Sequence, residues 1–135
     1  MLTSDSCVAV ELADLEHGRL DPKQFPHREH VRLAFEMVGR YSFPEALARF
    51  SKGLRQLAVK SGRPEAYHET ITAAFLALIG ERRLGEHSVN WEQFAEHNAD
   101  LFDKNLLREW YEPDVLNSAL ARRTFILPRR RVCAT

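Results

Sequence analysis

The sequence predicts an all-α protein that forms a single compact bundle of five or six helices with no β-sheet. Apolar residues recur every three or four positions in several segments, as the inward face of a helix requires. Proline, glycine and capping patterns separate these segments. No segment shows the sustained alternation of apolar and polar residues that is typical of a half-buried strand. These three observations agree on the fold class.

Length and composition fit one domain. The chain has 135 residues, of which 44% are hydrophobic and 28% charged, a mixture typical of globular proteins. We expect one helical domain at residues 1–128 and a basic C-terminal tail at residues 129–135, which contains three consecutive arginines. The sequence gives no oligomeric state, because that depends on exposed apolar area.

Charge, hydropathy and cysteine content indicate which classes of partner and which cellular location to expect. Basic and acidic residues balance at 19 each, so the overall field gives no reason to expect nucleic acid as a partner. The longest apolar run, Ala73 to Ile79, is far shorter than the roughly 20 residues that cross a bilayer, so we expect no membrane segment. Cys7 and Cys133 match no metal or disulfide pattern, and no signal peptide is evident. These features predict a cytoplasmic protein.

The first two helices are predicted from apolar spacing and from their ends. One covers residues 8–19 and is stopped by Gly18. The next opens at Phe25-Pro26, where Phe25 can pack back onto the helix as a hydrophobic staple, and it runs to about Tyr41. Its inward face consists of Leu33, Ala34, Met37, Val38 and Tyr41.

Two further long helices follow. Ser42 and Glu45 resemble a capping box for a helix at residues 43–60, which Gly62 ends. Pro64 is expected to start the third long helix, which continues to about Arg83 and is apolar over a broad arc.

Shorter elements complete the expected fold. Asn90 to Gln93 forms another capping pattern, and a segment from Lys104 to Tyr111 precedes the last helix. That helix is expected from Pro113 to Arg123. The apolar segment Phe125 to Pro128 is kept from being helical by its proline, and we expect it to lie across the bundle.

Two histidines at the start of the second helix are the first candidate site. His27 and His30 are three residues apart, so both imidazoles project from one side of the helix and could share a metal or a polar ligand. Zinc proteases instead use His-Glu-x-x-His, whereas Arg28 follows His27 here, so that family is not supported.

His68 adds a third imidazole on an inward face of a different helix. Three imidazoles from two helices could form a mononuclear site with an open position for zinc or iron, completed by Glu69 or Glu65. Glu65 and His68 also match half of the Glu-x-x-His pattern of di-iron bundles, but the second half is missing. The leading hypothesis is therefore a buried pocket lined by His27, His30 and His68 that binds a divalent metal and possibly a small-molecule substrate.

Four neighbouring residues could support the metal ligands or contact a substrate. Tyr67 and Thr72 supply hydroxyl groups beside His68, and Glu69 supplies a carboxylate. Thr72 could instead bond back to the carbonyl four residues earlier. Arg122, on the inward side of the last helix, could hold an anionic ligand or a buried carboxylate, or could simply be a last-turn cation.

Two alternatives remain at this stage. The protein could be a non-catalytic interaction or structural domain in which the histidines are core residues bonded to the backbone and to neighbouring side chains. A metal-free site could also pair a histidine with Glu29 or Glu69 for acid-base chemistry. The reaction, if one exists, does not follow from these residues.

Three motifs together resemble a known family. They are Phe25-x-His27-x-x-His30-x-x-Leu33-Ala34, then Tyr67 to Thr72, then Ser118-x-x-Ala121-Arg122-x-x-Phe125-x-Leu127-Pro128. Over residues 18–128 the chain is similar to a family of small, uncharacterised bacterial helical proteins. The resemblance implies that the three motifs belong together and implies no activity. An acidic residue is expected after the final proline, and Arg129 stands there instead.

Overall fold

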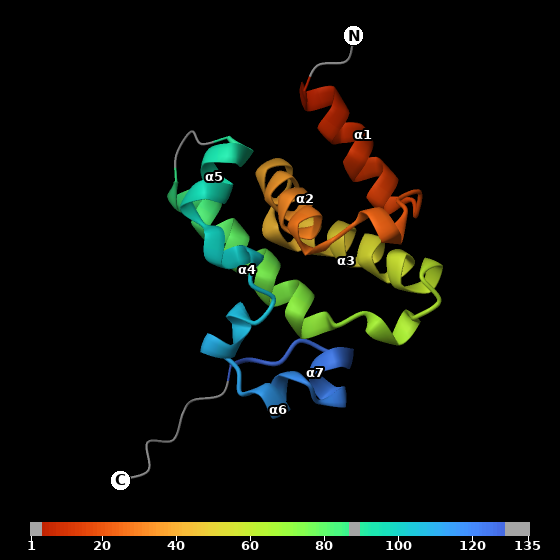
Figure 1. Ribbon diagram of the computed structural model, residues 1–135, viewed down its shortest axis with the longest axis vertical. Coiled ribbons are helices and arrows are strands. Elements are labelled where there is room, and N and C mark those ends of the chain that lie inside the picture. The colour runs from red at the N-terminus through yellow and green to blue at the C-terminus, as the bar shows by residue number, and fades with distance from the viewer. Residues whose placement is uncertain (1–3, 87–89, 129–135) are drawn as a thin grey trace.

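Seven α-helices follow one another in the computed structural model, which describes residues 4–86 and 90–128 (Figure 1). The long helices are α1 (Ser4–Glu16), α2 (His27–Arg40), α3 (Phe43–Lys60) and α4 (Glu69–Gly85). The short ones are α5 (Trp91–His97), α6 (Pro113–Leu116) and α7 (Ala119–Arg123). Short 3-10 turns lie between them: η1 (Pro22–Gln24), η2 (Pro64–Ala66), η3 (Ala99–Phe102) and η4 (Leu106–Glu109). The described residues contain no strand, so the all-α prediction is confirmed.

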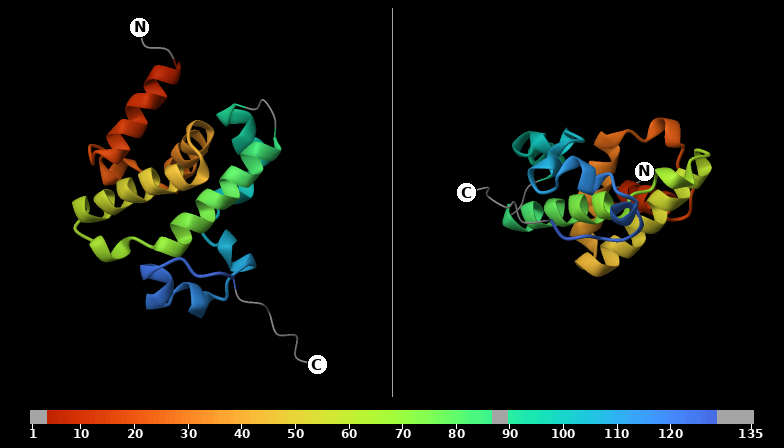
Figure 2. Two further views of the ribbon diagram at one scale, coloured as in Figure 1. Left: turned by 180° about the vertical axis from the view of Figure 1, so that it is seen from behind. Right: turned by 90° about the horizontal axis from the view of Figure 1, so that it is seen from below.

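Helix α4 is the central helix of the fold. It packs against α2 and α3 on one side and against α7 on another. Helix α1 lies against α3 and α2, away from α6 and α7, as the reverse view shows (Figure 2). The sequence predicts a broad apolar arc on α4, and this arc is needed because α4 has neighbours on several faces. Ala73, Leu76 and Ile79 of α4 are all buried.

The start of α4 differs from the prediction. Residues Pro64–Ala66 form a separate 3-10 turn, and α4 begins only at Glu69. His68 precedes it in an extended conformation with φ −134° and ψ 110°. The helix cannot extend back to Pro64, because the His68 ring caps its first turn by accepting a hydrogen bond from the Ile71 amide.

Other boundaries also shift. The first helix starts at Ser4 rather than residue 8, but it ends before Gly18, whose φ of 69° suits glycine. The capping box expected at Ser42 is not formed; the Glu45 carboxylate instead accepts a hydrogen bond from Arg49. The capping box at Asn90 is confirmed.

The expected last helix is divided in two. Asn117 ends α6, and the Ser118 hydroxyl accepts a hydrogen bond from the Ala121 amide at 3.1 Å, which caps α7. A serine that bonds to the backbone in this way favours a new helix start over continuation. Residues 113–123 therefore contribute two short helices, and the total exceeds five or six.

The C-terminal segment lies across the bundle, as the sequence predicts. Buried Thr70 donates through Oγ1 to the Thr124 carbonyl at 2.8 Å and accepts from the Ile126 amide at 3.1 Å. Tyr111 Oη donates to the Ile126 carbonyl at 2.8 Å. These bonds satisfy backbone groups that have no sheet or helix partner. The basic tail at residues 129–135 lies outside the described residues.

Candidate binding cavity

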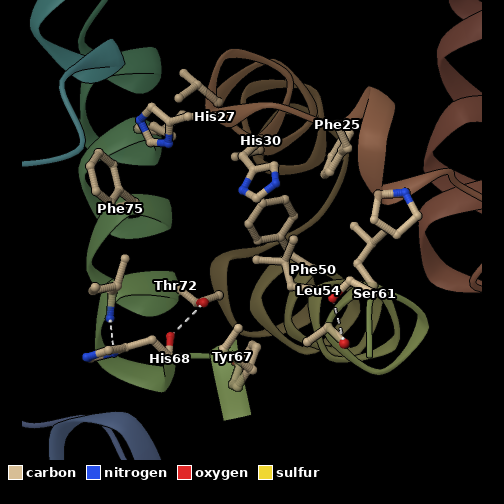
Figure 3. Close-up of a pocket in the computed structure, with 18 residues that line it drawn as sticks. Phe25, His27, His30, Phe50, Leu54, Ser61, Tyr67, His68, Thr72 and Phe75 are labelled. Atoms are coloured by element: carbon tan, nitrogen blue, oxygen red, sulfur yellow. Dashed lines mark hydrogen bonds between the residues drawn. The ribbon is translucent and has the colours of Figure 1, made fainter. Parts of the chain in front are cut away.

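A cavity of about 400 Å³ lies between α2, α3 and α4 (Figure 3). Of the 18 residues that line it, six carry polar side chains: Ser61, Tyr67, Thr72 and the three histidines His27, His30 and His68. The other lining residues are apolar, among them Phe25, Phe50 and Phe75. All three histidines singled out in the sequence therefore border one cavity, although their rings do not converge.

The turn before α2 places His30 in the cavity wall. Pro26 occupies the N-cap, so Phe25 precedes the cap and His30 is the fourth helical residue. The Phe25 and His30 rings contact each other at a tilt of 36°, with centroids 4.5 Å apart. This is the staple expected from the sequence, and a histidine is its helical member.

His30 is neutral at physiological pH. Burial, with smaller contributions from the nearby His27 and Lys104, lowers its pKa to about 4, against the effect of a hydrogen bond to the Phe25 backbone. Because an imidazole bonds to a carbonyl through its N–H, the second ring nitrogen of neutral His30 is an acceptor.

His27 lies beside His30 at the same end of the cavity (Figure 3), with ring centroids 6.4 Å apart. Its Nε2 is 2.9 Å from the Leu101 carbonyl oxygen, and its ring meets Phe75 edge-on at 5.3 Å. A carbonyl only accepts, so Nε2 carries the hydrogen and donates it.

His68 lies at the opposite end, with its ring directed away from the other two histidines (Figure 3). Its Nδ1 accepts from the Ile71 amide at 3.1 Å, and its Nε2 donates to the Leu116 carbonyl at 2.7 Å. Both ring nitrogens are therefore used in holding the backbone. Burial lowers the pKa of His68, with a smaller contribution from the charge of Arg122, and the neutral ring is the form that makes both bonds.

Tyr67 contributes the polar group that lacks a partner. Within residues 4–86 and 90–128, its buried Oη atom has no hydrogen-bond partner. Burial and the neighbouring Glu69 carboxylate raise the pKa of Tyr67, against the smaller effects of Thr72 and Arg55, so the phenol keeps its proton. Thr72 and Glu69 are thus the polar side chains nearest to the phenol, although neither meets the distance and angle of a hydrogen bond. On the outer side, the Arg55 guanidinium carbon lies 4.7 Å from the Tyr67 ring centroid.

The hydroxyls of Thr72 and Ser61 are already engaged. Thr72 Oγ1 donates to the His68 carbonyl at 2.8 Å, which is the back-bond to the residue four positions earlier that the sequence allowed. Ser61 Oγ donates to the Ala58 carbonyl at 2.8 Å. Neither hydroxyl has a hydrogen left for a ligand, although each can still accept.

Two expected site residues lie outside the cavity lining. The Glu69 carboxylate is 2.5 Å from Arg55 Nη2. Arg122 donates from Nη1 to the Glu65 carbonyl at 3.0 Å, so it stabilises the turn before α4 and does not enter the cavity. Neither side chain is among the residues that line the cavity, so a ligand contact by Glu69 or Arg122 stays a prediction.

The side chains do not assemble the expected three-histidine centre. In the part of the chain that the structure describes, no group of three or more His, Cys, Asp or Glu side chains could hold a metal ion. The acid-base alternative is also not formed as proposed, because Glu29 pairs with Arg32 at 2.5 Å and Glu69 with Arg55. Sequence reasoning missed the structural role of Thr70, because nothing in the segment Tyr67 to Thr72 indicates a partner 54 residues away.

Comparison of the chain with protein-family models, curated proteins and solved structures finds no match. The resemblance to a family of small bacterial proteins therefore stays a prediction. Among the helices described here, none combines the length and the apolar character needed to span a bilayer.

Proposed function

We propose that this protein binds an apolar small molecule in the cavity between α2, α3 and α4, and that it does so without a metal. The observation that carries this proposal is a cavity of about 400 Å³ whose described lining residues are apolar except for six and include no Lys, Arg, Asp or Glu.

The size and lining of the cavity support the same function. A volume of about 400 Å³ falls in the range of small-molecule sites, which are mainly apolar with a few polar groups that orient the ligand. Aromatic rings from three separate elements, Phe25, Phe50 and Phe75, supply contact area at low entropic cost.

The hydrogen bonds of His68 favour a metal-free site. A metal at His68 would have to displace either the Ile71 amide, which would break the cap of α4, or the Leu116 carbonyl, which would break the link to α6. The divalent zinc or iron expected from the sequence would then depend on His27 and His30, with His27 keeping its bond to Leu101. Two imidazoles are fewer than the three protein ligands of catalytic zinc sites.

The test uses N-phenyl-1-naphthylamine, an uncharged apolar probe that fluoresces when it leaves water. We expect it to bind the purified full chain with saturation. Ala66 lines the cavity and is exposed, so Ala66→Trp should fill the entrance with little cost in stability and should abolish most of the fluorescence.

The matched control is Ala77→Trp, because Ala77 is also exposed but lies on α4 outside the cavity lining. This variant should bind the probe as wild type does. Equal binding by both tryptophan variants, or no saturable binding by wild type, would refute the proposed cavity function.

A further inference from the structure

We infer that Arg122 is a positioning residue for the proposed binding site, because it holds closed the turn through which a ligand enters the cavity. We call this turn, residues 61–67 between α3 and α4, the mouth turn. The inference rests on the proposed function and specifies how exchange of the ligand is controlled. It gives a role to an arginine that the sequence indicates as a site residue and that lies outside the cavity lining.

The mouth turn forms the part of the cavity wall that reaches solvent. Ser61, Ala66 and Tyr67 of this turn line the cavity, and Ser61 and Ala66 are exposed. Every other described lining residue is buried or half-buried. Since a cavity opens where its lining residues also meet solvent, the entrance lies at the mouth turn.

Packing by itself holds the mouth turn weakly. Its 3-10 segment η2 (Pro64–Ala66) contains no buried residue. Gly62 precedes this segment with a φ of 78°, in the left-handed region, and an added Cβ atom would meet nothing within 4 Å. Segments with few buried contacts open more often than the helices that flank them. The turn can therefore move while α3 and α4 stay in place.

Arg122 ties the middle of the mouth turn to α7. Its Nη1 donates to the Glu65 carbonyl at 3.0 Å and reaches the Ala66 carbonyl at 3.5 Å. Both ribbon views show α7 beside the turn that joins α3 to α4 (Figure 1 and Figure 2). The exposed residue at the entrance, Ala66, is thus one of the two residues that Arg122 holds.

Loss of this tie should change the rates of ligand exchange and leave the affinity unchanged. Arg122 bonds to the backbone of the turn and does not line the cavity, so its bonds are the same whether the cavity is empty or filled. Their loss raises the open fraction of both states by the same factor. Entry and exit through the open turn then accelerate together, and Kd, which is their ratio, keeps its value.

The test is stopped-flow fluorescence of N-phenyl-1-naphthylamine with the full chain in excess. The slope and the intercept of the observed rate against protein concentration give the association and dissociation rate constants. We expect Arg122→Gln to raise both constants about two- to tenfold, as the loss of one hydrogen bond implies, with Kd unchanged. The matched control is Arg123→Gln, which removes the same charge from the next, exposed residue of α7 and should exchange the probe at wild-type rates.

Gly62→Ala tests the mouth turn without changing Arg122. Alanine disfavours the left-handed conformation, and no neighbour obstructs its Cβ atom, so this variant weakens the closed turn through the backbone alone. It should also raise both rate constants with Kd unchanged. Gly85→Ala, at a helical glycine with equal space around it, should not. If Arg122→Gln does not fold, wild-type rates in Gly62→Ala overturn the inference.

The outcomes separate the two proposals. If the probe binds and Ala66→Trp blocks it, but Arg122→Gln exchanges it at the wild-type rates, the inference is wrong and the cavity function stands. An Arg122→Gln variant with a weaker Kd and an unchanged association rate would show that Arg122 acts on the bound state, which also overturns the inference. Equal acceleration by Arg123→Gln would do the same. If the probe does not bind in the cavity, both proposals fall.

Discussion

Nδ1 of His68 lies 3.1 Å from the backbone nitrogen of Ile71 and accepts its hydrogen, so an imidazole serves as the N-cap of α4. The same ring donates from Nε2 to the Leu116 carbonyl, the last residue of α6. One neutral side chain thus joins the start of the central helix to the C-terminal part of the fold.

Replacing His68 should therefore reduce stability. His68→Ala removes a helix cap, which contributes about 1 kcal/mol, and leaves the Leu116 carbonyl without its donor, at about 1 to 3 kcal/mol. We expect the free energy of unfolding in urea to fall by about 2 to 4 kcal/mol. His68→Asn keeps an acceptor for the Ile71 amide and should recover about 1 kcal/mol. Equal losses in the two variants would contradict the capping role.

Metal removal should have little effect. The untagged protein, treated with a chelator and measured by thermal unfolding, should keep its midpoint, and elemental analysis should find far less than one divalent metal per chain. Zinc or iron near one per chain that disappears in a His27→Gln, His30→Gln variant would restore the metal hypothesis and defeat the metal-free proposal.

Stability should fall in mild acid because of His30. Its pKa is lowered from 6.5 to about 4, so between these values the unfolded chain binds more protons than the folded one. The contribution of neutral His30 to the free energy of unfolding is complete above pH 6.5. It is lost as the pH falls toward 4, by about 3 kcal/mol in all. The lowered pKa of His68 acts in the same direction.

Urea denaturation at a series of pH values measures this dependence. His30→Phe should flatten the stability profile between pH 4 and pH 6.5. His17→Gln, which changes an exposed histidine, should leave the wild-type profile in place. A His30→Phe profile as steep as that of wild type would show that other groups cause the acid sensitivity.

Gly53 permits the close approach of α1 to α3. A Cβ atom there would lie 2.5 Å from Leu15 Cγ and 2.9 Å from the Leu15 carbonyl oxygen. Because backbone must then move, Gly53→Ala should cost about 1 to 3 kcal/mol in spite of the better helix propensity of alanine.

The control for Gly53 is Gly85→Ala. Gly85 is also helical, but an added Cβ meets nothing within 4 Å. Thermal unfolding of this variant should show unchanged or slightly higher stability, by up to about 1 kcal/mol. A stable Gly53→Ala protein would mean that α1 packs less closely than the structure shows.

Thr70 fixes the C-terminal segment through two hydrogen bonds, to Thr124 and Ile126. Thr70→Val removes both bonds at nearly constant volume, so residues 124–128 should detach more often and the protein should lose about 1 to 3 kcal/mol. Limited digestion with trypsin should cut faster after Arg122 and Arg123.

Tyr111→Phe removes one bond, to the Ile126 carbonyl, and should give an intermediate cleavage rate. Trypsin cleavage of Thr70→Val at the wild-type rate would show that packing of Ile126, and not Thr70, holds the segment.

The sequence by itself determined the fold class, the inward faces of the long helices and several of their ends. Gly18 ends α1 because a left-handed residue is required there, and Asn90 starts α5 because its side chain reaches the Gln93 amide. These are local interactions between residues a few positions apart, so spacing and residue type are sufficient to predict them.

Tertiary structure alone decided what the polar residues do. The partner of His68 is a carbonyl 48 residues away and that of Thr70 is 54 residues away, and no pattern in one chain specifies such pairs. The sequence predicted that three histidines lie on inward faces, but it did not predict the direction of their rings. His68, for example, lies one residue before α4 and turns to cap it. Ring direction depends on which backbone groups are left unsatisfied after folding, and that is fixed only when the helices meet.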